Sequence, residues 1–224
     1  MEQQINYTDL HKVYPHNELK TPTYTIDLIT LTPEQVSQAK FRDRLDGNSW
    51  LSMGLESDFP YVRLKKNGEG VMMSDTPMER NTNRSFIHKA NGDVLIFGLG
   101  LGLIILPLLK KENVRSITVV ELYQDLIDLV LPILKQHDVD GKLTVLQGDC
   151  FEIHNYIDKK TKFDCIYGDI CISISTDNYE EMKTLTKNWK NRINRSNPDS
   201  FIDHWMKDYL RKEIAKDKRN SWYW

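Results

Sequence analysis

Residues 93–121, which read DVLIFGLGLGLIILPLLKKENVRSITVVE, constrain the fold more than any other segment. Residues 94–97 form a continuous apolar run, which is typical of a strand buried on both faces of a parallel sheet. Glycines stand at positions 98, 100 and 102, and the pattern then predicts a helix over 103–111 and a second buried strand over 116–120. The segment therefore predicts one βαβ unit with a right-handed crossover.

The glycines and the acid that ends the second strand indicate a ligand site. A tight turn from strand to helix needs unusual backbone angles, and a ligand can approach the backbone closely where no Cβ intrudes. Glu121 follows at a strand end, where a carboxylate can accept hydrogen bonds from both hydroxyls of a ribose. Leu103 replaces the third glycine of the dinucleotide fingerprint, which disfavours NAD and FAD. The spacing alone predicts a nucleotide-like ligand with a ribose.

The rest of the chain supplies further strands and helices. Thr32-Pro33-Glu34-Gln35 predicts a capped helix start, and Asn67-Gly68 predicts a hairpin. Expected strands are 24–31, 61–65, 71–74, 143–147, 162–167 and 200–205; expected helices are 33–45, 77–90, 123–137 (kinked at Pro132), 178–193 and 206–216. We expect a small α+β lobe over 1–75, followed by a Rossmann-like α/β domain over 76–224.

Composition narrows the class of protein. The chain has 224 residues, 40% hydrophobic and 28% charged, as in globular proteins, and its net charge of −2 disfavours duplex nucleic acid as a partner. The three cysteines show no CxxC spacing and the six histidines no HxH or HxxxH pairing, so no metal site is predicted. The number of cysteines is odd and we expect no signal peptide, which predicts a cytoplasmic protein. No apolar run is long enough to span a membrane, so we expect no membrane partner.

Four motifs carry a family resemblance. FGLGLG, VVELYQDLIDLV, LQGDCF and FDCIYGDI resemble class I S-adenosylmethionine-dependent methyltransferases, in particular the spermidine-synthase-like branch and its short phage and bacterial relatives. The resemblance covers roughly a third of the chain, about residues 93–170. It implies S-adenosylmethionine as the cofactor and a small lobe before the nucleotide fold.

Relative to that family, the sheet is expected to be shortened. Few residues follow Asp169, so we expect about five strands in the order 3-2-1-4-5. The fifth strand then has an open edge, which a partner subunit or the C-terminal tail would cover. The tail ends in Trp222, Tyr223 and Trp224, which could alternatively stack on a planar substrate.

The resemblance also implies roles for the residues that end the first three strands. The glycines would line the methionine end of the cofactor, Glu121 would hold the ribose, and an acid after the third strand would accept a hydrogen bond from the adenine amino group. Each position also has a plain structural reading, as a turn, a helix cap or a packing contact. The expected cofactor-binding residues are Gly98, Gly100, Gly102, Glu121, Tyr123, Asp149, Cys150 and Asp169.

Asp169 ends the fourth strand and should face the transferred group, because ligands bind outside the carboxyl ends of parallel strands. The resemblance leaves two roles open, catalytic proton acceptance from an attacking amine and binding of the cofactor's amino group. The second acid and the proline usual in aminopropyltransferases are absent from Gly168-Asp169-Ile170-Cys171. Asp75 and Glu79, just before the nucleotide fold, are candidate substrate residues or helix caps.

Three functions are compatible with these residues. We expect a methyltransferase that acts on a small molecule or another unidentified acceptor. The alternatives are an aminopropyltransferase of the spermidine synthase type and a non-catalytic S-adenosylmethionine-binding protein. The sequence has neither the proline-rich motif of amine-DNA methyltransferases nor a Pro-Cys nucleophile, which disfavours methylation of DNA bases.

Overall fold

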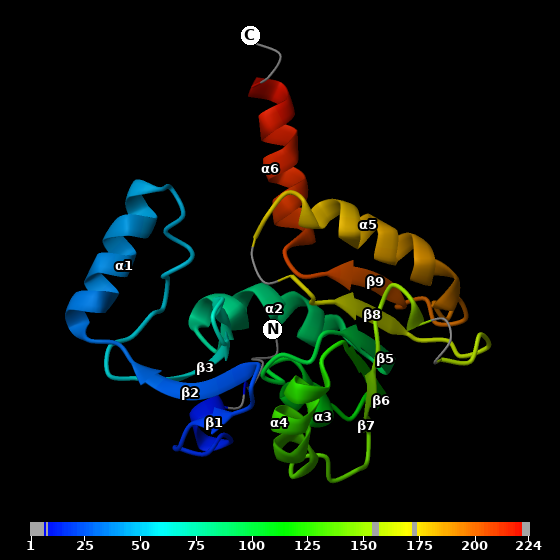
Figure 1. The fold of residues 1–224 in the computed structure, drawn as a ribbon. Coiled ribbons are helices and arrows are strands. Elements are labelled where there is room, and N and C mark those ends of the chain that lie inside the picture. Colours follow the sequence, from blue (N-terminus) through cyan, green and yellow to red (C-terminus); the bar gives the residue numbers. More distant parts are fainter. Residues whose placement is uncertain (1–6, 8, 154–156, 172–173, 221–224) are drawn as a thin grey trace. The chain divides into compact units, whose positions relative to one another are not determined.

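The computed structural model describes residues 7, 9–153, 157–171 and 174–220, and Figure 1 shows its ribbon. The chain groups into two compact units, which we describe separately. The first comprises Met1–His88, Gly100–Lys110 and Asp125–Asp140; the second comprises Lys89–Leu99, Lys111–Gln124 and Gly141–Trp224. The domain limits expected at residues 75 and 76 stay a prediction, and the aromatic residues 222–224 lie outside the described part. No described helix combines the length and apolar character needed to cross a membrane.

The first unit contains an antiparallel sheet of four strands in the order β1-β2-β3-β4. These strands are β1 (Leu19–Lys20), β2 (Tyr24–Thr30), β3 (Pro60–Lys66) and β4 (Gly70–Ser74). The turn between β3 and β4 contains Asn67 and Gly68, with Gly68 at a φ of 85°, so the predicted hairpin is confirmed. Helix α1 (Pro33–Leu45) begins with the predicted capping box: the Gln35 N–H donates to Thr32 Oγ1 at 3.2 Å, and the Thr32 N–H donates to Gln35 Oε1 at 2.9 Å.

The helices that alternate with the strands of the nucleotide fold mostly belong to the first unit. They are α2 (Pro77–Lys89), α3 (Ile105–Leu109) and α4 (Gln124–Lys135), and a short 3-10 turn, η1 (Leu10–Lys12), precedes the sheet. Helix α4 contains Pro132 and buries Leu126, Val130 and Leu134, as its periodicity predicts. Helix α3 is shorter than the predicted 103–111, because Gly102 has a φ of 70° and delays the first helical turn.

The second unit is built on a parallel sheet of five strands in the order β7-β6-β5-β8-β9. The strands are β5 (Gly92–Phe97), β6 (Val114–Glu121), β7 (Leu143–Gln147), β8 (Cys165–Gly168) and β9 (Phe201–His204). In chain order of these strands this is 3-2-1-4-5, so the predicted Rossmann-like sheet is confirmed. Strand β8 begins later than residue 162, because Phe163 makes only an isolated bridge to Ile193.

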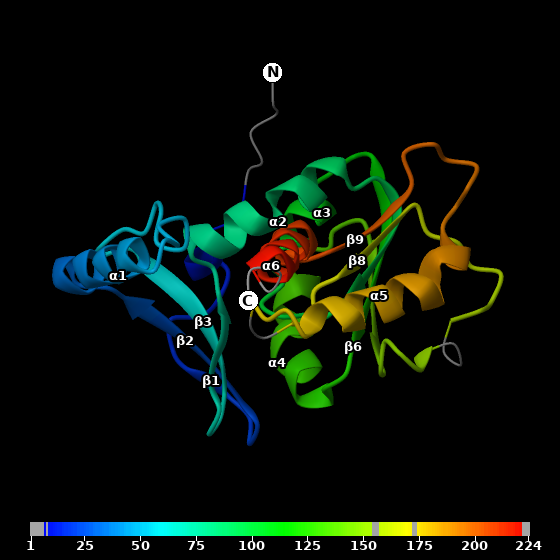
Figure 2. The same cartoon turned by 90° about the horizontal axis from the view of Figure 1, so that it is seen from above.

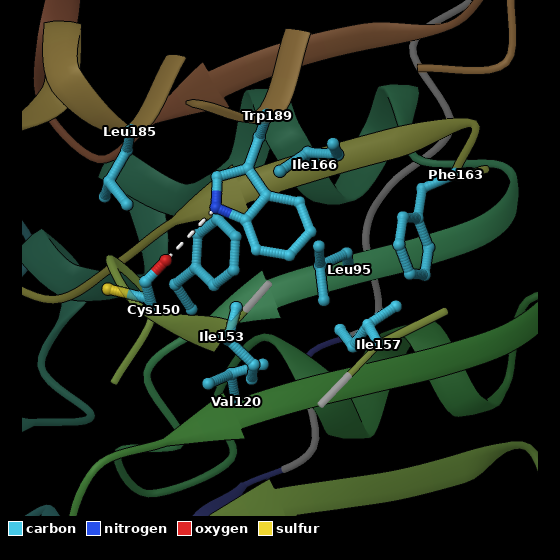
Figure 3. Close-up of a cluster of buried hydrophobic side chains, with 10 residues drawn as sticks. Leu95, Val120, Cys150, Ile153, Ile157, Phe163, Ile166, Leu185 and Trp189 are labelled. Carbon is cyan, nitrogen blue, oxygen red and sulfur yellow. Dashed lines mark hydrogen bonds between the residues drawn. The ribbon is translucent and has the colours of Figure 1, made fainter. Parts of the chain in front are cut away.

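Helix α5 (Asn178–Trp189) covers one face of this sheet, and Figure 2 shows it beside β8 and β9. It ends four residues before the predicted limit and continues as a 3-10 turn, η3 (Lys190–Arg192); α6 (Lys207–Asn220) follows β9. Trp189 is completely buried, with its ring centroid 5.0 Å from that of Phe97. Its Nε1–H donates to the Cys150 carbonyl at 3.1 Å (Figure 3). The cluster around it comprises Leu95, Phe97, Val120, Cys150, Ile153, Ile157, Phe163, Ile166, Leu185 and Trp189.

Replacing Trp189 by phenylalanine is expected to lower the free energy of unfolding by about 1–2 kcal/mol, because the buried Cys150 carbonyl loses its donor. Phenylalanine keeps most of the apolar contact, so the fold should persist. Urea denaturation followed by circular dichroism measures the change. Trp205→Phe is the control, since Trp205 is a second tryptophan of this unit outside the cluster. A Trp189→Phe variant as stable as the wild type would show that the indole hydrogen bond contributes nothing.

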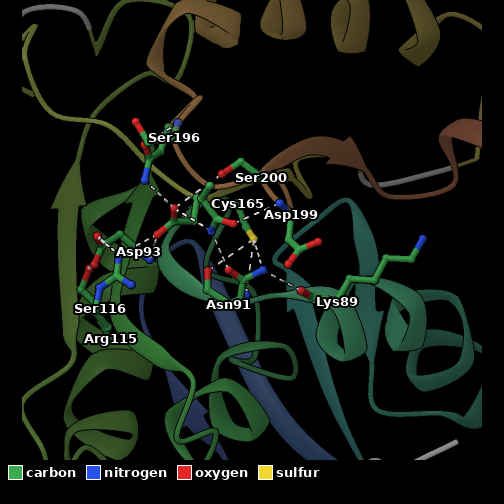
Figure 4. A network of polar contacts seen from close by, with 12 residues as sticks. Lys89, Asn91, Asp93, Arg115, Ser116, Cys165, Ser196, Asp199 and Ser200 are labelled. Carbon is green, nitrogen blue, oxygen red and sulfur yellow. Dashed lines mark hydrogen bonds and ion pairs between the residues drawn. The ribbon is translucent and has the colours of Figure 1, made fainter.

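A polar network closes the amino end of the sheet (Figure 4). The Asp164 carboxylate is 1% exposed and accepts hydrogen bonds from the Asp93 N–H at 2.8 Å, Asn194 Nδ2 at 2.8 Å, Asn197 Nδ2 at 2.9 Å and Arg115 Nη2 at 2.7 Å. Burial alone would raise the pKa of Asp164, but these donors outweigh it and lower the pKa to about 2. The ionised network joins the starts of β5, β6 and β8, so its contribution to stability is lost only as the pH falls from about 4 toward 2.

Candidate functional site

The carboxyl end of the second unit's sheet brings together most of the residues singled out from the sequence. Gly98, directly after β5, has a φ of 97°, and its N–H donates to the Val120 carbonyl at 2.9 Å. A Cβ at Gly98 would lie 2.2 Å from the backbone oxygen of Asp169. Both the backbone angle and the close approach require glycine, and the turn after β5 therefore lies directly against the residue that follows β8.

The Glu121 carboxylate is held by two backbone hydrogen bonds at this edge. This residue ends β6, is 6% exposed, and its Oε2 accepts the Leu99 N–H while its Oε1 accepts the Tyr123 N–H, both at 2.9 Å. Burial raises the pKa of Glu121, and the backbone N–H groups oppose that shift. A carboxylate has about four acceptor positions, so Glu121 retains capacity for further donors such as ribose hydroxyls. The two backbone bonds fix the direction in which that capacity points.

The turn after β7 lies beside Glu121, whose carbonyl accepts the Gly148 N–H at 2.9 Å. Asp149 is half-buried, and its Oδ1 accepts the Phe151 N–H at 2.8 Å. Cys150 is 8% exposed, and burial, with the charge of Asp149 adding to it, raises the pKa of its thiol to about 12. The thiol is therefore protonated and unreactive at neutral pH, so it can serve only as a wall of the site. The Tyr123 side chain is 41% exposed.

The backbone around Asp169 is held from both neighbouring strands. The Asp169 N–H donates to the Phe97 carbonyl at 2.8 Å, and the Gly168 carbonyl accepts the Trp205 N–H at 2.9 Å. Within the described part of the chain, no group donates a hydrogen bond to the Asp169 carboxyl group. Burial raises the pKa of Asp169 to about 7. This carboxyl group can therefore change its charge near neutral pH while its backbone stays fixed.

Glu181, which the sequence analysis did not single out, belongs to the same region. It lies in the first turn of α5. Burial raises the pKa of both Cys150 and Cys171, to about 12 in each case, and the negative charge of Glu181 contributes to both shifts. It was missed because the sequence of α5 indicates a charged surface helix. The available signal was its place in the helix that follows β8.

The other predicted glycines have packing roles within the first unit. A Cβ at Gly100 would lie 2.5 Å from Met73 Sδ, which also accepts the Leu101 N–H at 3.2 Å. A Cβ at Gly102 would lie 2.5 Å from Leu134 Cδ2. Close packing is thus sufficient to explain both glycines, and their role toward a cofactor stays a prediction.

Asp75 and Glu79 also belong to the first unit. Asp75 is completely buried; its Oδ1 accepts the Val62 N–H at 2.8 Å and its Oδ2 pairs with Arg80 Nη2 at 2.9 Å. Burial nevertheless raises the pKa of Asp75. Glu79 lies half-buried in the first turn of α2. A structural role explains Asp75, and substrate binding by either residue stays a prediction. Among the described residues, no group of three or more His, Cys, Asp or Glu side chains could hold a metal ion.

The comparison with protein families covers the central part of the chain. Residues 81–191, just under half of the sequence, match the family described as spermine/spermidine synthase domain. This segment is a spermine/spermidine-synthase-like domain. It contains β5 to β8 and α5, with the Gly98 turn, Glu121, Asp149 and Asp169. A comparison with curated protein sequences gave no match.

Solved structures similar to the chain share little sequence with it. Spermidine synthase from Thermotoga maritima is 16% identical, with a TM-score of 0.45 over 79% of this chain and 53% of that one. Fibrillarin from Aeropyrum pernix, in complex with natively bound S-adenosyl-L-methionine, is 14% identical, with a TM-score of 0.40 over 52% and 46%. The CcbJ methyltransferase from Streptomyces caelestis is 13% identical, with a TM-score of 0.43 over 56% and 48%. The chain spans about half the length of each of these proteins.

Proposed function

We propose that the chain binds S-adenosylmethionine at the carboxyl end of its parallel sheet and transfers the methyl group to an acceptor. The observation that carries this proposal is the Glu121 carboxylate, buried at the end of β6 and oriented by the N–H groups of Leu99 and Tyr123. A buried acid with remaining acceptor capacity at this strand end suits the two hydroxyls of a ribose. The spermine/spermidine-synthase-like domain supports the same ligand class.

The other residues of the edge suit the rest of the ligand. Asp149 and Cys150, after β7, would contact the adenine, with the exposed ring of Tyr123 on its other face. Asp169 would hold the amino group, because its carboxyl group has no donor among the described residues and can ionise near neutral pH. Acidic side chains also attract a ligand that carries a sulfonium and an ammonium group.

When bound, the cofactor supplies a methyl group already activated by a sulfonium. The chain's residues then need mainly to orient the ligand and to keep water from the reacting atoms, which can supply much of the rate acceleration. The Glu121 carboxylate, oriented by backbone N–H groups, would hold the nucleoside part of the ligand. Asp169, whose backbone is hydrogen-bonded to β5, would hold the amino acid part. An acceptor that is already nucleophilic needs no strong base.

Aminopropyl transfer is a second candidate, favoured by the family match and by Glu181. In addition to burial, its negative charge and that of Asp169 both raise the pKa of Cys171, so Glu181 adds a second acid around Cys171 although none directly follows Asp169 in the sequence. Two acids of this kind suit a diamine. A binder without turnover is the remaining alternative. We further propose a small-molecule acceptor, a cytoplasmic location and self-association through the edge of β9.

Titration calorimetry should show that S-adenosylmethionine and S-adenosylhomocysteine bind and that NAD does not, because Glu121 suits a ribose while Leu103 replaces the third glycine of the dinucleotide motif. Decarboxylated S-adenosylmethionine separates the two transferase candidates. A clear preference for the decarboxylated compound would favour aminopropyl transfer. Tight NAD binding without any adenosyl-sulfur ligand would overturn the proposal.

A further inference from the structure

The peptide bond between Cys150 and Phe151 is held at both of its ends. The carbonyl oxygen of Cys150 accepts the Trp189 Nε1–H at 3.1 Å, and the N–H of Phe151 donates to Asp149 Oδ1 at 2.8 Å. These two groups belong to one planar unit, in which they point in opposite directions. A rotation of this peptide would therefore disturb both hydrogen bonds together. The indole of Trp189 and the carboxyl group of Asp149 are thus joined through a single rigid group.

Trp189 is the fixed end of this connection. It is the last residue of α5 and is completely buried, with its ring centroid 5.0 Å from that of Phe97. The guanidinium group of Arg192 lies 5.8 Å from the same ring. Figure 3 shows the indole nitrogen turned toward the Cys150 carbonyl. Because packed interiors leave little room for a side chain to move, the indole holds the peptide against the core.

The Asp149 carboxyl group is the other end. It is half-buried, and within the described part of the chain the Phe151 N–H is its one hydrogen-bond donor, so it can accept further bonds. The turn begins at Gly148, whose N–H donates to the Glu121 carbonyl at 2.9 Å. A bond from an aspartate to the N–H two residues later forms in many turns without distant support. It explains the local turn, whereas Trp189 ties that turn to the core.

The hydrogen bond from Trp189 has two possible roles, which predict different results. A buried carbonyl without a donor is costly, so the indole could serve the stability of the core alone. In that case substitution of Trp189 would lower stability and leave the Asp149 carboxyl group as it is. The shared peptide predicts a second effect, because the Phe151 N–H would lose its alignment with Asp149 once the Cys150 carbonyl is released.

We propose that Trp189 is a positioning residue for the adenine end of the cofactor: through the Cys150–Phe151 peptide its indole orients the Asp149 carboxyl group that accepts the adenine amino group. This inference rests on the role of Asp149 in the proposed function. Trp189 acts through the peptide and needs no contact with the ligand. The preference for a base that carries an amino group then depends on a residue of the core.

The first experiment needs no ligand and follows the Phe151 amide proton of the full chain by 15N–1H NMR. A carboxylate acceptor moves an amide proton downfield, so Asp149→Ala should shift this resonance upfield in the wild type. In Trp189→Phe, which keeps most of the apolar contact, Asp149→Ala should cause about half of that shift or less, because a released peptide no longer keeps the N–H aligned with the carboxylate. An equal shift in both backgrounds would overturn the proposal.

Leu185→Ala is the matched control, because Leu185 lies in the same buried cluster and its side chain makes no hydrogen bond. It should lose stability while the response of Phe151 to Asp149→Ala stays at its wild-type size. A response reduced as much as in Trp189→Phe would contradict the proposal, since any loss of packing would then suffice. If Trp189→Phe does not fold, the Trp189 indole proton is followed in Asp149→Ala instead. It should exchange with solvent about threefold faster or more, and unchanged exchange would contradict the proposal.

The second experiment measures the consequence for binding by calorimetry. Its ligands are S-adenosylhomocysteine and the analogue that carries purine in place of adenine and so lacks the amino group. Trp189→Phe should weaken S-adenosylhomocysteine by about two- to tenfold and leave the analogue unaffected. In an Asp149→Ala background it should cause no further loss. An equal loss for both ligands would refute the positioning role. If S-adenosylhomocysteine fails to bind to the wild type, the proposed function is overturned, while the ligand-free NMR response still decides whether Trp189 orients Asp149.

Discussion

Replacing Asp169 by asparagine is expected to weaken the binding of S-adenosylmethionine by about ten- to a hundredfold at pH 7.5, because a hydrogen bond to a charged group is worth about 1.5–3 kcal/mol. At pH 5 the loss should nearly vanish. Burial raises the pKa of Asp169 to about 7, so at pH 5 the wild-type carboxyl group is mostly neutral and resembles the asparagine amide. The affinity of the wild type for the cationic ligand should therefore rise with pH through this range, and that of the variant should stay flat. Calorimetry at pH 5, 6 and 7.5 measures both.

The control is Asp199→Asn, which removes a carboxylate at the amino end of β9 and should leave the affinity unchanged at every pH. The Asp169→Asn variant also separates the two possible roles of Asp169. If this residue accepts a proton from the acceptor, Asp169→Asn keeps full affinity and turnover falls by about 10²–10⁴-fold, the usual worth of general base catalysis. That result would contradict the binding role and favour aminopropyl transfer. Equal affinity with no measurable turnover in either protein would indicate a non-catalytic binder.

Glu121→Ala is expected to weaken the binding of S-adenosylmethionine by about ten- to a hundredfold, because two ribose hydroxyls lose a charged acceptor worth about 1.5–3 kcal/mol. The substitution also leaves the N–H groups of Leu99 and Tyr123 without their acceptor. Its melting temperature must therefore be compared with that of the wild type. Calorimetry gives the dissociation constant of the folded variant.

Glu121→Gln separates the two effects. Its single amide oxygen can accept from one of the two N–H groups, so it should fold better than the alanine variant while still binding the ligand less tightly than the wild type. Glu112→Ala, which removes an exposed acid before the opposite end of β6, is the matched control and should change nothing. Wild-type affinity in both Glu121 variants would place the ribose elsewhere.

Most of the fold could be predicted from the sequence because the patterns that indicate its helices, strands and turns are local. The apolar runs of β5 and β6, the capping box at Thr32 and the turn at Asn67-Gly68 each lie within a few residues, and each prediction is confirmed. Limits of elements were less predictable. Helix α3 starts late because of the φ of Gly102, and β8 starts late because Phe163 makes only an isolated bridge to the distant Ile193.

Residues of the candidate site could be predicted from the sequence only where they lie in a recognisable motif. Gly98 and Asp169 directly follow strands and Glu121 ends one, so their approach at one edge could be predicted from topology. Glu181 could not, since its neighbours are brought to it by the packing of α5. The packing roles of Gly100 and Gly102 depend likewise on Met73 and Leu134, which lie some 30 residues away in the sequence.

The backbone link between Gly168 and Asp169 has a consequence for how the proposed transferase can diversify. The Asp169 N–H donates to the Phe97 carbonyl and the Gly168 carbonyl accepts the Trp205 N–H, and neither partner lies in the segment that joins Asp169 to α5. The acid that we propose to bind the cofactor is thus anchored independently of that connecting segment. Mutation can alter the length and composition of residues 170–177 while the anchored acid keeps its place. New acceptors could accordingly be acquired through drift in one short stretch, with the chemistry of the donor inherited unchanged.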